Sequence, residues 1–124
     1  MTENYTAGVC NIGPQEIQAR RRFGHLGLAV SVVVGALMLV TDAPHLLRLL
    51  ILFPAAGAAM GYLQAAFRFC AGFGMRGVYN FGRLGSVHVV ADAQEHQRDR
   101  RRSLQITGVS LLIGCAAALL LYRV

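Results

Sequence analysis

The sequence predicts an all-α membrane protein with three transmembrane helices, an antiparallel hairpin followed by a third helix that carries a cytoplasmic extension. Two observations lead to this fold class. Three apolar stretches, residues 23–41, 49–67 and 103–122, are each about as long as the roughly 20 helical residues that cross a ~30 Å hydrocarbon core. In addition, ten of the twelve arginines lie before the first stretch or between the second and the third.

The arginine distribution also predicts the orientation of the chain and its segments. Under the positive-inside rule, the N-terminus and the segment between the second and third spans are cytoplasmic, and the C-terminus is outside. All twelve basic residues are arginine, a habit typical of GC-rich bacterial genomes, which favours the bacterial inner membrane as the location. The expected order is a cytoplasmic tail with a short helix (1–22), the first span (23–41), an external turn (42–48), the second span (49–67), a cytoplasmic segment (68–102) and the third span (103–122).

Capping residues predict where the first two helices begin and end. Gly13 suits an N-cap and Pro14 suits the first helical position, so one helix is expected from Pro14 up to the polar turn at residues 41–44. In that turn Asp42 is expected to cap the second helix. Pro54 is expected to bend the second span, because its ring displaces the carbonyl of the residue four positions earlier.

The cytoplasmic segment 68–102 has two halves of different composition. Residues 69–85 are rich in glycine and aromatic residues, which disfavours a regular helix and predicts a loop along the membrane surface or packed on a partner. Lipid headgroups are the expected partners of Arg68, Arg76 and Arg83. From Val87 onward the pattern is helical and charged, so one long helix is expected to run from there to Tyr122. On this helix Asp99 is expected to pair with Arg102, three residues later.

Small residues four positions apart mark the expected helix-packing faces. Such residues let helix backbones approach closely, which drives helix association in lipid. The faces serve either packing within the three-helix chain or contact with other subunits. The residues are Gly57 and Gly61 in the second span, Ser31 and Gly35 in the first, and Ser110 and Gly114 in the third.

Two cysteines are the first candidates for chemistry. Cys10 and Cys70 both lie on the predicted cytoplasmic side, where thiols normally stay reduced. A helix N-terminus and nearby arginines favour a thiolate, which binds metal or attacks a disulfide. The alternative is two unrelated small residues. Cys115 lies inside the third span and is expected to serve packing only.

Histidines are the second candidates. His88, Asp92 and His96 recur at four-residue spacing on the expected long helix and include ligand types that zinc or non-haem iron accepts. The two histidines would lie about 12 Å apart on a straight helix, so all three residues cannot bind one metal. A solvated polar face is the alternative. His25 and His45 lie near opposite membrane faces, and each is a weaker candidate for facing a haem or a pigment.

The N-terminal half resembles a group of small bacterial inner-membrane proteins of uncharacterised function. The resemblance rests on Cys10-Asn11-Ile12-Gly13-Pro14, then Glu16-Ile17 and Arg20-Arg21-Arg22, followed by a short hairpin and a cysteine after the second span. It implies the compartment, and it carries over no activity and no catalytic residue.

The sequence therefore favours a protein that acts by binding, as an accessory or scaffold subunit of a larger membrane complex. An enzyme is not expected, and neither is a resident cofactor. The expected partners are membrane lipids and other membrane subunits or further copies of the chain, and not nucleic acid, despite a net charge of +6. The first alternative is a thiol- or metal-dependent redox protein that uses Cys10 and Cys70. A homo-oligomeric channel is a further alternative, which the scarcity of polar residues along the spans disfavours.

Overall fold

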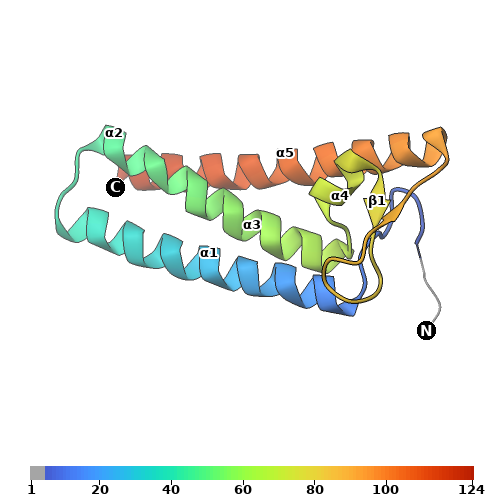
Figure 1. Cartoon of the computed structure of the whole chain (residues 1–124). Helices are drawn as coiled ribbons and strands as arrows, with labels where there is room; N and C mark the ends of the chain where they lie inside the picture. Colours follow the sequence, from blue (N-terminus) through green and yellow to red (C-terminus); the bar gives the residue numbers. More distant parts are fainter. Residues whose placement is uncertain (1–4) are drawn as a thin grey trace.

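The computed structural model describes residues 5–124 and is mostly helical. Three helices long and apolar enough to cross a membrane lie side by side (Figure 1). They are α1 (Pro14–Val40), the composite helix His45–Phe67, and α5 (Ala93–Arg123). We call the end of the array where α1 begins the arginine-rich end, and the opposite end, where the chain reverses and also terminates, the turn end.

Helix α1 begins and ends where its sequence predicts. Gly13 is the N-cap in an extended conformation, Pro14 is the first helical residue, and Glu16 lies in the first turn. Proline is favoured there because the first helical N–H groups have no partner within the helix. The helix then continues without interruption to Val40, and Thr41 closes it. The predicted first helix with a short extension is thus confirmed as one continuous element.

The second helix is assembled from three pieces. They are α2 (His45–Arg48), the 3₁₀ turn η1 (Leu49–Ile51) and α3 (Leu52–Phe67). The 3₁₀ turn lies directly before the turn that contains Pro54. A proline at this position removes one i→i−4 hydrogen bond, so the preceding turn tightens to i→i−3 bonds.

The predicted role of Asp42 as a cap was wrong. Pro44 is the N-cap of α2, and no side chain caps that helix. Asp42 has a positive φ of 51°, and its Oδ1 accepts a bond from Nη2 of Arg48 at 3.1 Å. Asp42 therefore stabilises the turn by an ion pair with Arg48 of the next helix, six residues later.

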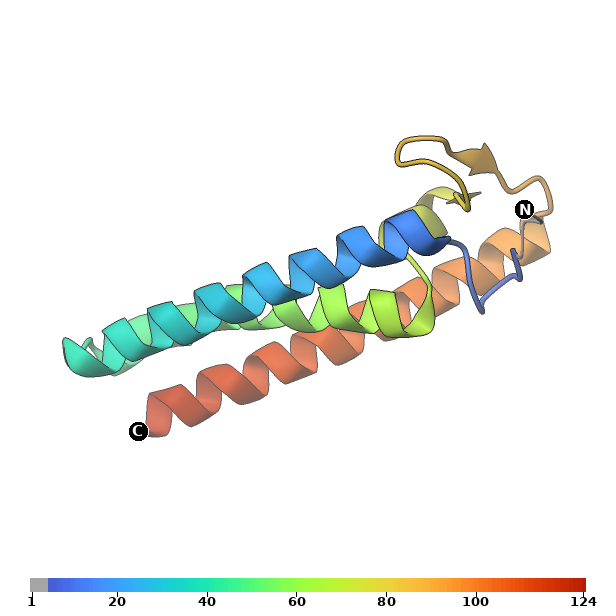
Figure 2. The same cartoon turned by 90° about the horizontal axis from the view of Figure 1, so that it is seen from below.

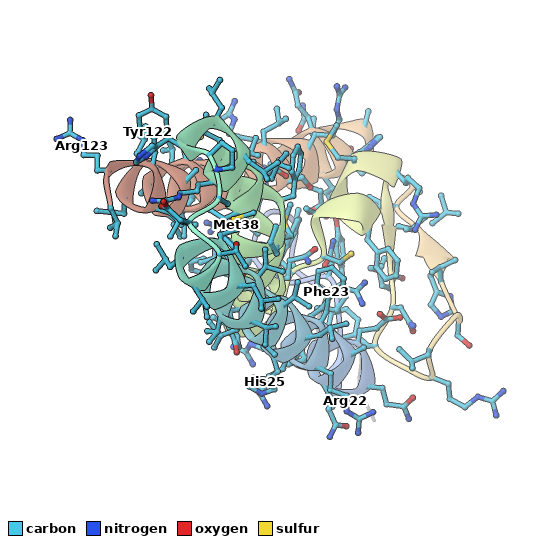
Figure 3. The ribbon with its side chains drawn as sticks, turned by 90° about the vertical axis from the view of Figure 1, so that its left-hand side faces the viewer. Arg22, Phe23, His25, Met38, Tyr122 and Arg123 are labelled. Carbon is cyan, nitrogen blue, oxygen red and sulfur yellow. The ribbon has the colours of Figure 1, made fainter. Side chains whose placement is uncertain are left out.

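The middle helix, α3, is the centre of the array. Both α1 and α5 pack on it, so α1 and α5 flank it on two sides (Figure 2). A view along the helices has Arg22 and His25 on the outer side of α1, while Tyr122 and Arg123 lie at the end of α5 (Figure 3). The three helices thus form an open arrangement around α3.

Glycines allow the two helix pairs to approach closely. A Cβ atom added at Gly61 would lie only 2.7 Å from Cα of Gly24 and 2.8 Å from the carbonyl oxygen of Arg20, so α1 touches α3 backbone to backbone. At the other contact, a Cβ at Gly114 would lie 2.9 Å from the carbonyl oxygen of Leu52. Close backbone contact of this kind increases van der Waals packing, which holds apolar helices together.

Most of the predicted small-residue faces are therefore used inside the chain. Gly61, Gly114 and Ser110 are buried between helices, and the hydroxyl of Ser110 donates to the carbonyl of Ile106 at 2.8 Å. Gly57 is less tightly placed, because a Cβ there would lie 3.8 Å from the ring of Phe23. Of the two uses that the sequence left open for Gly57 and Gly61, Gly61 serves packing within the chain.

The segment between the second and third spans folds at the arginine-rich end. It contains helix α4 (Ala71–Arg76) and two short antiparallel strands, β1 (Val78–Tyr79) and β2 (His88–Val89). The predicted helix start at Val87 was wrong, since α5 begins at Ala93 with Asp92 as its N-cap. The β-branched residues around His88 favour an extended chain.

This segment packs on its own chain. The ring of Phe69 is fully buried, and Phe73 is also buried, in a small core with Ile12 and Cys70. Helix α4 packs on α5, where a Cβ at Gly74 would lie 2.9 Å from the carbonyl oxygen of Asp99. Two aromatic residues of the loop, Phe69 and Phe73, are thus covered within the monomer.

We expect Gly61→Leu to separate α1 from α3, because the new side chain would occupy the space of the α1 backbone. Overpacking of this kind costs roughly 1–3 kcal/mol or more. The midpoint of thermal unfolding in mild detergent should fall clearly below that of the wild type. Gly108→Leu is the matched control, since a Cβ there meets nothing within 4 Å. Equal midpoints for both variants would contradict the close contact.

Candidate functional site

The first candidate site is a polar cluster at the arginine-rich end, built around Asn11 and Cys70. The side chain of Asn11 brackets the backbone of Cys70: its Oδ1 accepts from the Cys70 amide at 2.7 Å, and its Nδ2 donates to the Cys70 carbonyl at 3.1 Å. The backbone amide of Asn11 also donates to the carbonyl of Arg68 at 3.1 Å. One residue of the N-terminal tail therefore fixes the chain just after α3.

A second asparagine fixes the tail to the loop before β2. The backbones of Asn80 and Asn11 are joined by a bond of 2.9 Å, and the carbonyl of Asn80 accepts from the amide of Gly13 at 2.8 Å. The side-chain amide of Asn80 donates to Glu16 at 2.9 Å and to the carbonyl of Arg83 at 2.7 Å. Both asparagines are fully buried, and their amide groups satisfy backbone atoms that regular structure does not pair.

The cluster ends in a charged pair beside a thiol. Glu16, almost completely buried, binds Arg20 at 3.0 Å one helical turn further along α1. The other terminal nitrogen of Arg20 donates to Sγ of Cys70 at 2.9 Å. The guanidinium also lies 5.6 Å from the ring centroid of Phe73, within range of a cation–π contact. The sulfur of Cys70 therefore accepts a hydrogen bond from a guanidinium that also binds a carboxylate.

A second polar contact joins the tail to α5. Asp99 is fully buried, and its two carboxylate oxygens accept from the hydroxyl of Tyr5 and the amide of Gly8, each at 2.7 Å. The pKa of Tyr5 is raised, mainly by burial and in addition by the hydrogen bond to Asp99 and the charge of that carboxylate. The phenol therefore keeps its proton and donates a hydrogen bond to Asp99. Asp99 was expected to pair with Arg102. Its carboxylate instead accepts hydrogen bonds from Tyr5 and Gly8 of the N-terminal tail.

Arg102 lies at the junction between the polar end and the apolar helices. Its Nε donates to the carbonyl of Gly8 at 2.9 Å, and its guanidinium carbon is 5.4 Å from the ring centroid of Phe67. Two hollows meet at this side chain. One, of about 180 Å³, is lined by Arg98, Arg101, Arg102 and Gln105 together with the tail. The other, of about 350 Å³, is apolar and runs between α3 and α5.

The turn end has a groove of a different kind. It has a volume of about 340 Å³ and is almost wholly apolar. Ser31 and Gly35 of α1 form one wall, Ala117 and Leu120 of α5 form the other, and Ala55 of α3 lies at the base. A Cβ at Gly35 would find only Ile51 within 4 Å, at 3.8 Å. The groove therefore has room for a larger side chain at Gly35, although Gly35 itself is buried.

Arg48 is a buried cation at the same end. It is 3% exposed, and its Nε donates to the carbonyl of Ala43 at 2.9 Å while Nη2 binds Asp42. Its Nη1 is buried without a hydrogen-bond partner among residues 5–124. The side chain thus ties the reversal of the chain to the second helix.

The cysteines that sequence analysis singled out lie at one end of the array but in different environments. Cys70 is buried against Arg20, whereas Cys10 is half-buried next to Asn11. No disulfide forms within residues 5–124. Cys115 is exposed on the apolar surface of α5.

The metal and pigment candidates are separated from one another. His88 lies on β2, Asp92 caps α5, and His96 lies on α5 with Nε2 at 3.2 Å from the carbonyl of Met75. Within residues 5–124 no group of three or more metal-binding side chains is assembled. His25 contacts the hydroxyl of Tyr62 at 2.7 Å, and His45 contacts the carbonyl of Tyr122 at 2.6 Å.

The three arginines expected at lipid headgroups all keep exposed side chains. Arg68 is the C-cap of α3 and has a left-handed backbone conformation. The guanidinium of Arg76 lies over the ring of Phe73, and the carbonyl of Arg83 accepts a hydrogen bond from the side chain of Asn80. Sequence analysis missed Asn11, Asn80 and Asp99. Each has a partner 59 or more positions away along the chain, so no local pattern in the sequence signals these contacts.

Comparison of this chain with protein-family models, with curated proteins and with solved structures finds no match. Function is therefore argued from the arrangement of the residues themselves. Three features are distinctive: the asparagine-held polar end with its Arg20 to Cys70 contact, the arginine-lined hollow that meets an apolar slot, and the open small-residue groove.

Proposed function

We propose that this chain is a small integral membrane protein that acts by binding, as an accessory or scaffold subunit of a larger complex in the bacterial inner membrane. In this proposal α1 and the second helix cross as an antiparallel hairpin, and α5 crosses as the third span. The length and hydropathy of the three helices support insertion. The observation that carries the binding role is the open groove between α1 and α5.

The groove supports binding because of what lines it. Its walls combine Ser31 and Gly35, four residues apart on α1, with Ala117 on α5. Small residues at this spacing let a foreign helix approach the backbone closely, and close packing is what associates helices in lipid. The corresponding small residues Gly24 and Gly61 are already occupied by contact within the chain. Ser31 and Gly35 therefore form the surface that remains for a transmembrane helix of another subunit.

Substitution of Gly35 tests this role directly. Gly35→Leu should fill the groove while the monomer stays folded, because a Cβ there has room. We expect the variant to keep the thermal midpoint of the wild type and to shift from a complex to the monomer in native mass measurement. Gly108→Leu is again the matched control and should leave the complex intact. A monomeric wild type, or identical behaviour of both variants, would remove the support for a scaffold.

The orientation is a separate part of the proposal and has its own test. The arginine-rich end is proposed to face the cytoplasm, because positively charged flanks are retained there. Cys10 is half-buried and serves as the reporter in place of the buried Cys70. A membrane-impermeant maleimide should label Cys10 only after the cells are opened, and a reporter fused after Val124 should be active outside. Labelling in intact cells would reverse the orientation.

The contact between Arg20 and Cys70 favours a second candidate function, thiol redox chemistry. In that case the thiols of Cys10 and Cys70 would form a disulfide, and their two electrons would reduce a disulfide-containing oxidant such as glutathione disulfide to two thiols. After treatment with glutathione disulfide and trapping of the remaining thiols, mass spectrometry should find a Cys10 to Cys70 bridge that dithiothreitol reverses. The control is Cys115→Ser, which should not change it. A Cys70 that stays reduced while Cys10 is glutathionylated would leave Cys70 as a hydrogen-bond acceptor for Arg20.

A further inference from the structure

We propose that the junction of α3 and α5 at the arginine-rich end binds one anionic phospholipid. Its phosphate would lie in the hollow lined by Arg98, Arg101 and Arg102, and one acyl chain would lie in the apolar slot beside α3. The inference does not depend on the scaffold role, because this site lies at the opposite end of the array from the open groove.

The two hollows are neighbours with opposite chemistry. The polar hollow and the apolar slot share Arg102 and Gln105 as lining residues, so one opens next to the other. The slot is otherwise lined by apolar side chains of the two helices, namely Leu63, Phe67, Ile106 and Val109. A ligand that fills both must carry an anionic group and a hydrocarbon chain close together, and a phospholipid has this construction.

The spacing along α5 suits such a ligand. Arg98, Arg101, Gln105 and Val109 recur every three or four residues, so they share one face of the helix. Eleven residues separate Arg98 from Val109, which is about 16 Å along an α-helix. This distance along α5 is long enough to accommodate the headgroup of a phospholipid and the first part of one of its acyl chains. Arg102, stacked near Phe67 at the end of α3, lies where the polar and apolar parts meet.

Among residues 5–124, the arginines of the polar hollow form no ion pair with an acid. The acid nearest to its arginines in sequence, Asp99, is fully buried and turned to Tyr5 and Gly8. Arg98 and Arg101 are exposed, and a second hollow beside them is lined by the same two arginines with Gln94 and Gln97. Guanidinium groups bind phosphate oxygens through paired hydrogen bonds, which gives this surface its preference for phosphate.

A soluble anion or a nucleic acid explains less of the geometry. Either would occupy the arginines and leave the adjoining slot of about 350 Å³ uncovered. A neutral lipid would fill the slot and leave three guanidinium groups without a counter-charge. The volume of the slot lies within the ~300–1,000 Å³ range of small-ligand sites. An anionic lipid is the one ligand class that satisfies both parts.

The test uses the full chain in mild detergent, with native mass spectrometry of bound lipid. Phosphatidylglycerol and phosphatidylcholine with identical acyl chains are offered in competition, and phosphatidylglycerol should be retained in preference. Soluble glycerol phosphate in excess should not displace it. Equal retention of the two lipids, displacement by glycerol phosphate, or displacement by a short RNA in place of lipid would each overturn the proposal.

Two pairs of variants locate the site. Arg98→Gln with Arg101→Gln should weaken phosphatidylglycerol retention roughly tenfold or more, since each arginine near a lipid surface contributes about 1 kcal/mol. The control, Arg21→Gln with Arg22→Gln, removes the same charge from exposed positions on α1, outside the hollow. If both double variants weaken retention equally, the effect is one of net charge and the site is wrong.

The second pair tests the slot. Val109→Phe should block the acyl chain and lower retention, while Leu112→Phe, at an exposed apolar position further along α5, should not. Unchanged thermal midpoints check that all variants fold. Retention that is insensitive to Val109→Phe would mean that only the headgroup binds, which contradicts the proposal.

Discussion

The arginine-rich end depends on one constraint, which is the need to satisfy the backbone of an irregular segment that has been buried. The chain between α3 and α5 is too rich in glycine to pair all of its own amides and carbonyls in regular structure. Asn11 and Asn80 meet this need, because each offers a donor and an acceptor on one side chain. The tail, the loop and the start of α1 are thus joined by two amide groups.

This arrangement changes how the aromatic and glycine-rich loop should be understood. From composition alone, residues 69–85 were expected to need the membrane surface or a partner to cover them. Phe73 instead packs against Ile12 and Cys70, and Phe69 is fully buried. These two aromatic rings are thus covered by the chain itself, while the later part of the segment, including Leu84, stays exposed. The case for association then rests on the groove at the turn end, where small residues leave an apolar volume of about 340 Å³ between α1 and α5.

The sequence was sufficient for features that depend on local interactions. Gly13 and Pro14 marked the start of α1, and the apolar stretches marked all three long helices, because caps and hydropathy act within a few residues. It failed at Asp42 and at Val87. In both places a local preference lost to a contact with a residue at least six positions away: Asp42 binds Arg48, and His88 on β2 pairs with Tyr79 on β1.

The candidate sites were less predictable for the same reason. The thiols and arginines were recognised as chemical groups, but which arginine meets Cys70 depends on how α1 packs beside the end of α3. Asp99 was expected to be one half of an exposed ion pair on α5, and it is a buried acceptor for residues more than ninety positions away. Contacts over such separations leave no periodic pattern in the sequence, so only the fold identifies them.

The position of Asp99 also explains why positive charge persists beside it. Had its carboxylate paired with Arg102 on the surface of α5, the helix would carry a neutralised patch where it meets the apolar slot. The tail instead uses that carboxylate to bind Tyr5 and Gly8, and Arg102 is held by a neutral carbonyl. Docking of the tail therefore removes the one acid among these arginines from the surface. The same contacts that order the N-terminus leave a cationic hollow at the mouth of an apolar one.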